Sequence, residues 1–253
     1  MANSINKKDK ILFLHIPKTA GTSVNLMLSK GFQTNRIKLH AESERSSRYK
    51  NINWQNFDFI SGHLLLRELT TLIPAHNNVL KITILRNPIQ QLLSHINWVK
   101  YISNDTNSKF FKNHPDDIKD FSLKLREINF NKANEVIFFL ENMPDIGHRL
   151  FNNCQTRYLM DKASIRISAA DAQKAIDSLS FFDYVGTLEN LENFIQKIYF
   201  EMNWSVKTKV IKSNALKNKY KVNIDSKKIE EALYPLYCAD KILYEHTTQQ
   251  PLF

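Results

Sequence analysis

Short apolar runs of strand length alternate along the chain with segments of helical spacing. The first run begins at Ile11 and is followed by a turn rich in Pro, Gly and hydroxyl residues, and then by a helical segment over residues 23–30. Further apolar runs at residues 57–63, 79–85 and 182–186 predict three more strands. This alternation predicts an α/β fold of three layers, with a central, mainly parallel sheet and helices on both faces.

The segments between these strands carry weaker patterns. Residues 33–55 are polar and basic, and we expect a loop with one short amphipathic piece there. Residues 104–180 show helical spacing over most of their length, and Thr187 is placed to cap a helix over residues 188–202. An amphipathic helix over residues 225–245, packed on the sheet, is predicted to end the fold.

Length and composition predict a single domain over residues 1–253. A chain of this length with 43% hydrophobic residues can bury a substantial core, and no Ser/Gly/Pro-rich linker interrupts it. Cys154 and Cys238 are too few for a disulfide scaffold and lack the spacing of a zinc or redox site. The amino terminus has no apolar signal core and no stretch has the length of a membrane span, so we expect a cytoplasmic protein.

The charge balance suits an acidic partner. Lys and Arg number 35 against 25 Asp and Glu, a net charge of +10. A nucleotide, an anionic glycan or a nucleic acid would each satisfy this excess, although the lysines are dispersed and form no dense block.

The turn after the first strand has the chemistry of a phosphate site. A helix start offers unpaired backbone N–H groups and a partial positive charge, Thr22 and Ser23 add hydroxyl groups, and Lys18 adds a full charge. Gly21 allows the backbone to approach an anion closely. Such turns also occur in α/β proteins without a ligand there. A nucleoside triphosphatase loop requires the Lys after its second Gly, whereas here Lys18 precedes Gly21.

A second anion-binding pattern follows the third strand. Arg86 leaves the strand tip, Pro88 suits the first turn of a helix, and Ser94 follows about two turns into that helix. A guanidinium fork and a hydroxyl group that converge would hold a phosphate dianion. Taken alone, the same residues also fit an ordinary salt-bridging Arg and a helical Ser. A magnesium-dependent kinase would need an Asp at such a strand tip, so Arg86 disfavours that class.

The two patterns together resemble a known family. Residues 15–23, His-Ile-Pro-Lys-Thr-Ala-Gly-Thr-Ser, are similar to the P-loop-like 5′-phosphosulfate loop of sulfotransferases that use PAPS (3′-phosphoadenosine 5′-phosphosulfate), in the form typical of the carbohydrate branch. Arg86-Asn87-Pro88, with Ser94 eight residues after Arg86, resembles the family's 3′-phosphate motif. Animal Golgi members of that family carry a membrane anchor. Because we find no apolar stretch of that length in this sequence, we expect it to be similar to the soluble, bacterial-type members. The residues that the resemblance assigns to PAPS are Lys18, Thr19, Ala20, Gly21, Thr22, Ser23, Arg86 and Ser94.

The resemblance also implies catalytic roles for His63 and Lys18. A lone His is usually structural, but His63 follows a predicted strand end, where α/β sheets bind their ligands. Gly62-His63 resembles the segment that supplies the catalytic base in hexuronic-acid and glucosamine O-sulfotransferases. Some of those enzymes carry a further His two residues earlier, where this chain has Ser61. Lys18 would stabilise the charge on the departing 5′-phosphate.

Four more residues are predicted to contact the ligands. Arg157 lies in a segment similar to one frequent in carbohydrate sulfotransferases, and we predict that it and Arg67 bind the acceptor. Lys212 and Ser213 lie in a basic stretch over residues 207–219, which in the family helps to close over the nucleotide.

The predicted function is therefore transfer of a sulfuryl group from PAPS to a hydroxyl group of a glycan or glycolipid, without a metal and without a nucleic-acid partner. Two alternatives remain open at this point. A nucleotide kinase or triphosphatase of the P-loop type would require magnesium. A basic nucleic-acid-binding module is allowed by the charge, although no aromatic RNA motif or zinc spacing is present. The acceptor and the oligomeric state are not determined by the sequence.

Overall fold

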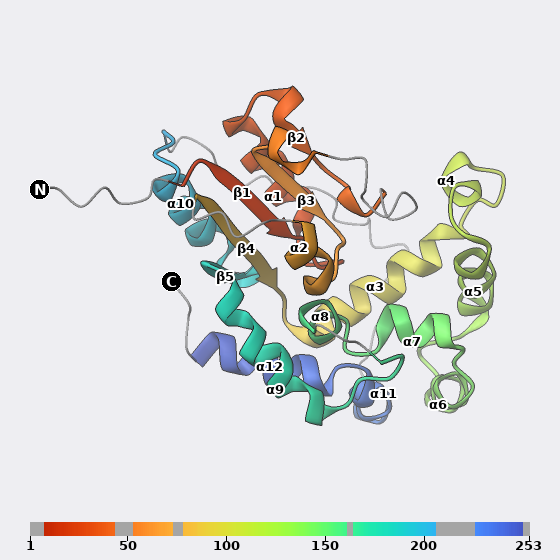
Figure 1. Cartoon of the computed structure of the whole chain (residues 1–253). Coiled ribbons are helices and arrows are strands. Elements are labelled where there is room, and N and C mark those ends of the chain that lie inside the picture. Colours follow the sequence, from red (N-terminus) through yellow and green to blue (C-terminus); the bar gives the residue numbers. More distant parts are fainter. Residues whose placement is uncertain (1–7, 44–52, 73–77, 161–163, 206–225, 250–253) are drawn as a thin grey trace, which may run out of the picture.

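A parallel sheet forms the centre of the molecule (Figure 1). The computed structural model describes residues 8–43, 53–72, 78–160, 164–205 and 226–249. Within these ranges the sheet has five strands in the order β2-β3-β1-β4-β5, and every neighbouring pair is parallel. The strands are β1 (Lys10–Leu14), β2 (Ile37–Lys38), β3 (Phe59–Gly62), β4 (Val79–Leu85) and β5 (Tyr184–Thr187).

The register brings the carboxyl ends of three strands together. Leu14, the last residue of β1, lies opposite Gly62 of β3 and Thr83 of β4. The central strands are almost continuously buried, as expected for a parallel sheet that is covered on both faces. The segments that follow β3, β1 and β4 therefore begin side by side at one edge of the sheet.

Helices α1 (Gly21–Leu28) and α10 (Leu191–Glu201) cover one face of the sheet. Successive residues of a strand point to opposite faces, and Phe13 packs on this face with Met27 and Phe194. The Tyr199 hydroxyl donates a hydrogen bond to the Met27 carbonyl over 3.0 Å and joins the two helices.

Four other helices cover the opposite face, to which Leu12 and Leu14 of β1 point. Leu69, Leu159 and Leu243 belong to the same buried cluster. The helices are α2 (Leu66–Leu72), α8 (Cys154–Leu159), α9 (Ala172–Asp177) and α12 (Cys238–Gln249). The predicted three-layer α/β fold with a central parallel sheet is confirmed.

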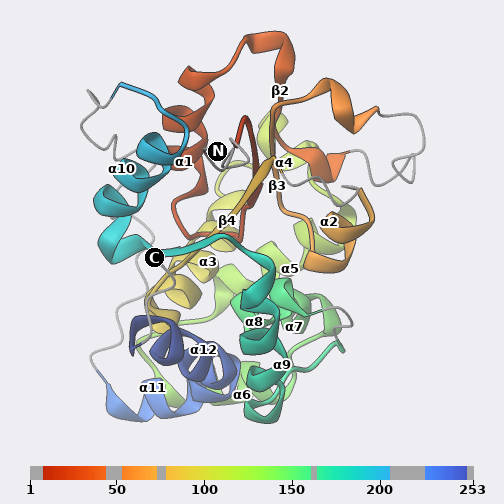
Figure 2. The same ribbon diagram turned by 60° about the vertical axis from the view of Figure 1, so that its left-hand side comes forward.

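A helical lobe extends from the sheet along α3 (Pro88–Ile102), as Figure 2 shows below and behind the strands. Its separate core contains Ile96 of α3, Phe121, Phe139 and Leu233. The helices that accompany α3 are α4 (Lys109–Lys112), α5 (Asp116–Glu127), α6 (Ala133–Glu141), α7 (Asp145–Phe151) and α11 (Lys227–Leu233).

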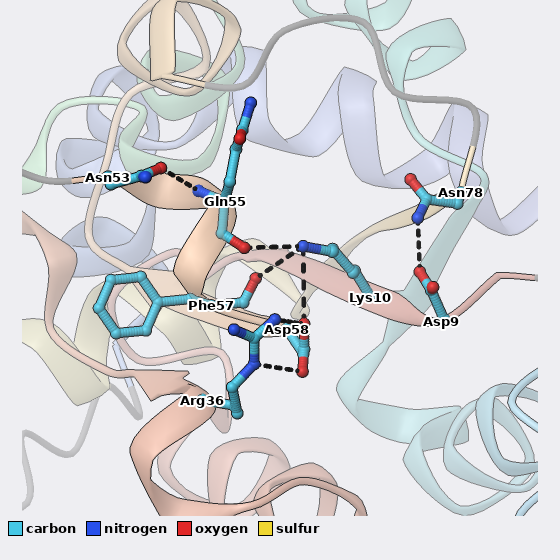
Figure 3. A network of polar contacts seen from close by, with 8 residues as sticks. All are labelled: Asp9, Lys10, Arg36, Asn53, Gln55, Phe57, Asp58 and Asn78. Carbon is cyan, nitrogen blue, oxygen red and sulfur yellow. Dashed lines mark hydrogen bonds and ion pairs between the residues drawn. The ribbon is translucent and has the colours of Figure 1, made fainter.

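A polar network closes the amino-terminal edge of the sheet, away from the carboxyl ends (Figure 3). Arg36 donates two hydrogen bonds to Asp58, over 2.8 and 2.6 Å, and Lys10 Nζ donates to the Gln55 carbonyl over 3.0 Å. The Arg36 guanidinium is the main cause that lowers the pKa of the Asp58 carboxyl group. These side chains join the starts of β1, β2 and β3.

Three local predictions were wrong. The edge strand β2 lies in the stretch that was expected to be a loop. It could not be predicted, because two residues are too few to show the alternation of a strand. The helix expected over residues 225–245 is two helices, α11 and α12, separated by a 3-10 turn at Tyr234–Leu236 that contains Pro235. Thr187 makes no side-chain cap, and a 3-10 turn precedes α10.

Among the helices of the described ranges, none has the length and hydrophobicity needed to span a bilayer.

Candidate active site

The loop between β1 and α1 is held in an uncommon backbone conformation. Lys18 and Ala20 have φ values of 68° and 73°, in the left-handed region that residues other than Gly seldom adopt. Such a conformation costs about 1–3 kcal/mol and persists only where the surroundings enforce it. Here the Thr19 hydroxyl donates to the Ile16 carbonyl over 2.9 Å, and Gln91 of α3 donates to the Pro17 carbonyl over 2.9 Å.

Arg86 follows the last residue of β4 and reaches this loop. Its Nη1 donates a hydrogen bond to the Lys18 carbonyl over 3.1 Å. Burial, and then the Arg86 charge, lowers the pKa of Lys18, and burial lowers the pKa of Arg86 despite the opposing influence of Glu189. Two partly desolvated cations, of which Arg86 also lowers the pKa of Lys18, are a setting that an anion would compensate. The structure thus brings the two predicted phosphate motifs together.

The hydroxyl groups predicted to bind phosphate lie on the two helices that start at this edge. Thr22 is exposed and Ser23 is buried in the first turn of α1. Ser94 is half-buried on α3, whose start is capped by Asn87 through a bond from the Gln90 N–H group over 3.3 Å. Pro88 occupies the first position of that helix, as predicted.

His63 follows β3 and is fixed by two contacts. Its Nδ1 lies 2.7 Å from the His15 carbonyl oxygen, and its backbone N–H group donates to Glu42 Oε2 over 2.8 Å. A carbonyl oxygen only accepts hydrogen bonds, so we assign a ring hydrogen to Nδ1; in the neutral imidazole the lone pair is then on Nε2. That tautomer is the one a general base requires.

The imidazole of His15 fills the space beside Gly21. A Cβ atom at Gly21 would lie 1.7 Å from His15 Nε2. The His15 ring also stacks on Phe13 and lies 4.2 Å, centroid to centroid, from the His63 ring. Packing against His15 therefore requires a glycine at position 21, a reason that the local motif did not reveal.

His95 and Trp98 of α3 also belong to this site. His95 is only 3% exposed, and its Nδ1 has no hydrogen-bond partner within the described residues. Burial, reinforced by the charges of Lys18 and His63, lowers the pKa of His95 to about 3. The Lys18 ammonium lies 6.0 Å from the Trp98 ring centroid. The sequence analysis did not predict that His95 and Trp98 belong to the site. Trp98 lies one helical turn after Ser94, but the same spacing is found for residues that pack in a core.

Four predicted residues remain, and none of the contacts described above involves Arg67 or Arg157. Arg67 is exposed on α2. Arg157 is buried, and its guanidinium donates to the carbonyl groups of Ser164 and Ile165 over 2.6 and 2.8 Å. These bonds favour a structural role for Arg157, because both terminal nitrogens of its guanidinium donate to backbone carbonyl groups. Lys212 and Ser213 lie outside the described residues.

Within the described parts of the chain, no group of three or more His, Cys, Asp or Glu side chains is arranged to hold a metal ion. The two cysteines, Cys154 and Cys238, are buried free thiols. Burial is the main cause that raises the pKa of the Cys154 thiol.

The fold is that of an α/β protein, and the predicted phosphate-binding residues lie at the carboxyl ends of neighbouring parallel strands. The family model described as "Sulfotransferase family" matches residues 3–247, and the chain belongs to that family. No curated protein matches the chain. Membership confirms the predicted family and establishes a transferase of sulfuryl groups, but it does not distinguish the carbohydrate branch or a bacterial type.

Replacement of Gly21 by Ala should lower the stability of the protein, because the new methyl group overlaps the His15 ring. Overpacking of this kind costs about 1–3 kcal/mol. In a His15→Ala background the same change should be neutral or stabilising, since Ala favours a helix more than Gly does. Urea unfolding of the four proteins measures this, and an equal cost in both backgrounds would contradict the packing argument.

Acid should destabilise the protein through His95. Its folded-state pKa of about 3 lies below the usual value of 6.5, so the unfolded chain binds the proton first as the pH falls. The stability is present above pH 6.5 and is lost progressively toward pH 3; at pH 5.5 the loss is about 1.4 kcal/mol. In His95→Gln the loss between pH 7.5 and 5.5, measured by urea unfolding, should be smaller by that amount. Identical losses would show that His95 does not titrate in this way.

Proposed function

We propose that this protein transfers the sulfuryl group of PAPS to a hydroxyl group of a carbohydrate acceptor, by direct in-line transfer. The observation that carries the proposal is the 3.1 Å contact between the Arg86 guanidinium and the Lys18 carbonyl. It supports a ligand with two phosphate groups, one for the loop and one for the strand tip. PAPS has a 3′-phosphate group in addition to its 5′-phosphosulfate, whereas ATP carries all its phosphates at one end.

In this proposal the donor lies across the carboxyl ends of β1 and β4. The backbone N–H groups from Thr19 to Gly21, where the loop enters α1, and the hydroxyl groups of Thr22 and Ser23 hold the 5′-phosphosulfate. The Thr19 hydroxyl is bonded to Ile16, so Thr19 contributes through its backbone. Arg86 and Ser94 hold the 3′-phosphate, with the guanidinium supplying a planar fork.

The transfer needs one base and one cation. Nε2 of His63 takes the proton of the acceptor hydroxyl group as its oxygen forms a bond to sulfur. The bond between sulfur and the bridging oxygen breaks, and its electron pair stays on the 5′-phosphate of PAP, the product. The Lys18 ammonium stabilises that developing charge. The contact of His63 Nδ1 with a carbonyl oxygen supports this assignment, because a ring hydrogen on Nδ1 leaves Nε2 as the nitrogen that can accept a proton.

A carbohydrate acceptor is supported by the resemblance of the two motifs and by Trp98. The indole ring lies beside Lys18, on the helix that carries Ser94 and His95, and aromatic faces pack well on the C–H surface of a sugar ring. Arg67, exposed just beyond His63, is proposed to contact the acceptor. Lys212 and Ser213 keep their predicted role in closing over the nucleotide.

The donor assignment predicts a distinct pattern of nucleotide binding. PAP at 100 times its Kd should raise the stability of the protein by about 2.7 kcal/mol. AMP, which lacks the 3′-phosphate, should bind more weakly because Arg86 and Ser94 have no partner. Thermal unfolding with PAP, AMP and ATP plus magnesium tests this. Stabilisation by ATP with magnesium but not by PAP would favour a P-loop kinase or triphosphatase.

Replacement of His63 by Ala should slow turnover about 10²–10⁴-fold while leaving the Kd of PAP unchanged, because the base acts on the acceptor. The measurement is transfer from radiolabelled PAPS across a panel of anionic and neutral glycans, together with titration calorimetry of PAP. His246→Ala, on α12, is the matched control and should turn over normally. Near-normal turnover of His63→Ala would require another base.

A further inference from the structure

The side chain of Gln155 binds the backbone of Arg86 through two reciprocal hydrogen bonds. The Arg86 N–H group donates to Gln155 Oε1 over 2.8 Å, and Gln155 Nε2 donates to the Arg86 carbonyl over 2.9 Å. The pairing of β4 with β5 ends at Leu85 opposite Thr187, one residue before Arg86. Gln155 therefore satisfies the first backbone polar groups beyond that pairing, as a further strand residue would.

Gln155 is itself held rigidly. It is 0% exposed and lies in the first turn of α8, whose Gln155 and Thr156 N–H groups donate to the two oxygens of Asp240 over 3.1 and 2.7 Å. Asp240 lies on α12 and is 2% exposed. Asn153 adds a second link, because its Oδ1 accepts the Ala239 N–H group over 2.7 Å. The Gln155 amide that binds Arg86 is thus anchored to α12, which packs on the face of the sheet to which Leu12 and Leu14 point.

Arg86 lies between the end of β4 and the start of α3. The direction of its side chain therefore depends on how the backbone turns at this residue. Its guanidinium contacts the Lys18 carbonyl at one end, and its backbone is held by Gln155 at the other. The next residue is also held, since the Asn87 N–H group donates to Glu189 over 3.2 Å. A small rotation of the Arg86 backbone would move the guanidinium by more than a hydrogen-bond tolerance, so precise backbone support matters there.

We propose that Gln155 is a positioning residue that sets Arg86 to recognise the 3′-phosphate of the nucleotide. The inference rests on the proposed function and names the residue on which its 3′-phosphate selectivity depends. A glutamine suits the role because its amide supplies one acceptor and one donor at the distance that the two backbone groups require. Leu removes both groups, and Glu keeps an acceptor but places a carboxylate oxygen against the Arg86 carbonyl.

The test compares two nucleotides that differ only in the 3′-phosphate. The Kd values of PAP and AMP are measured by titration calorimetry for the wild type and for Gln155→Leu, Gln155→Glu and Arg86→Ala. Gln155→Leu should raise the Kd of PAP about tenfold or more and change the Kd of AMP less than about twofold. Only the charge-assisted bonds to the 3′-phosphate are lost, and AMP does not make them. Gln173→Leu on α9, which removes a surface glutamine bonded to Asp177, is the matched control and should change neither.

A double variant separates positioning from general damage. In an Arg86→Ala background, Gln155→Leu should have little further effect on PAP, because the residue through which it acts is absent. If Gln155→Leu does not fold, Gln155→Glu gives the same comparison. Equal weakening of PAP and AMP, or full additivity with Arg86→Ala, would overturn the positioning role. A wild type that does not prefer PAP over AMP would overturn the proposed function and this inference with it.

Discussion

The contact between the Arg86 guanidinium and the Lys18 carbonyl joins the two segments that are proposed to bind the phosphate groups. It depends on the parallel pairing of β1 with β4, because that register places the start of the β1 loop next to the tip of β4. Both cations lose hydration there, and burial lowers the pKa of each. Folding thus concentrates positive charge at one edge of the sheet, where a ligand with separated phosphate groups would compensate it.

Polar side chains from distant parts of the chain support this edge. Backbone groups beyond the end of a sheet have no ladder partner, and an unpaired buried group is costly. Gln91 satisfies the Pro17 carbonyl and Gln155 satisfies both groups of Arg86. This support explains how two residues of the loop, Lys18 and Ala20, keep a left-handed conformation without being glycine.

Two buried histidines of the site, His15 and His95, are held in the neutral form. Burial is the largest cause that lowers the pKa values of His15 and His95, and nearby cations act in the same direction. His63 lies against the His15 ring with its Nδ1 directed at a carbonyl oxygen, which leaves the lone pair on Nε2. Cations that would suit an anionic donor thus lie in the same part of the molecule as the imidazole proposed to be the base.

Much of the fold and of the candidate site is local in sequence. The strand over residues 79–85 and the helix that begins at Pro88 occur as predicted, since burial on both faces and a proline in the first turn leave clear patterns. The candidate phosphate-binding residues of the β1 loop and of the β4 tip could also be predicted from the sequence, because each motif lies within a few consecutive residues. The structure adds that they meet, which the order of strands in the sheet determines.

Other features were decided only by tertiary contacts. Gln155 and Arg86 are 69 residues apart, and Arg157 binds the carbonyl groups of Ser164 and Ile165, which no local pattern in the sequence indicates. The need for glycine at position 21 comes from the His15 ring, and the depressed pKa of His95 comes from burial. A sequence specifies which groups are polar and which are apolar, whereas hydrogen-bond partners and hydration depend on which distant segments the packed core brings together.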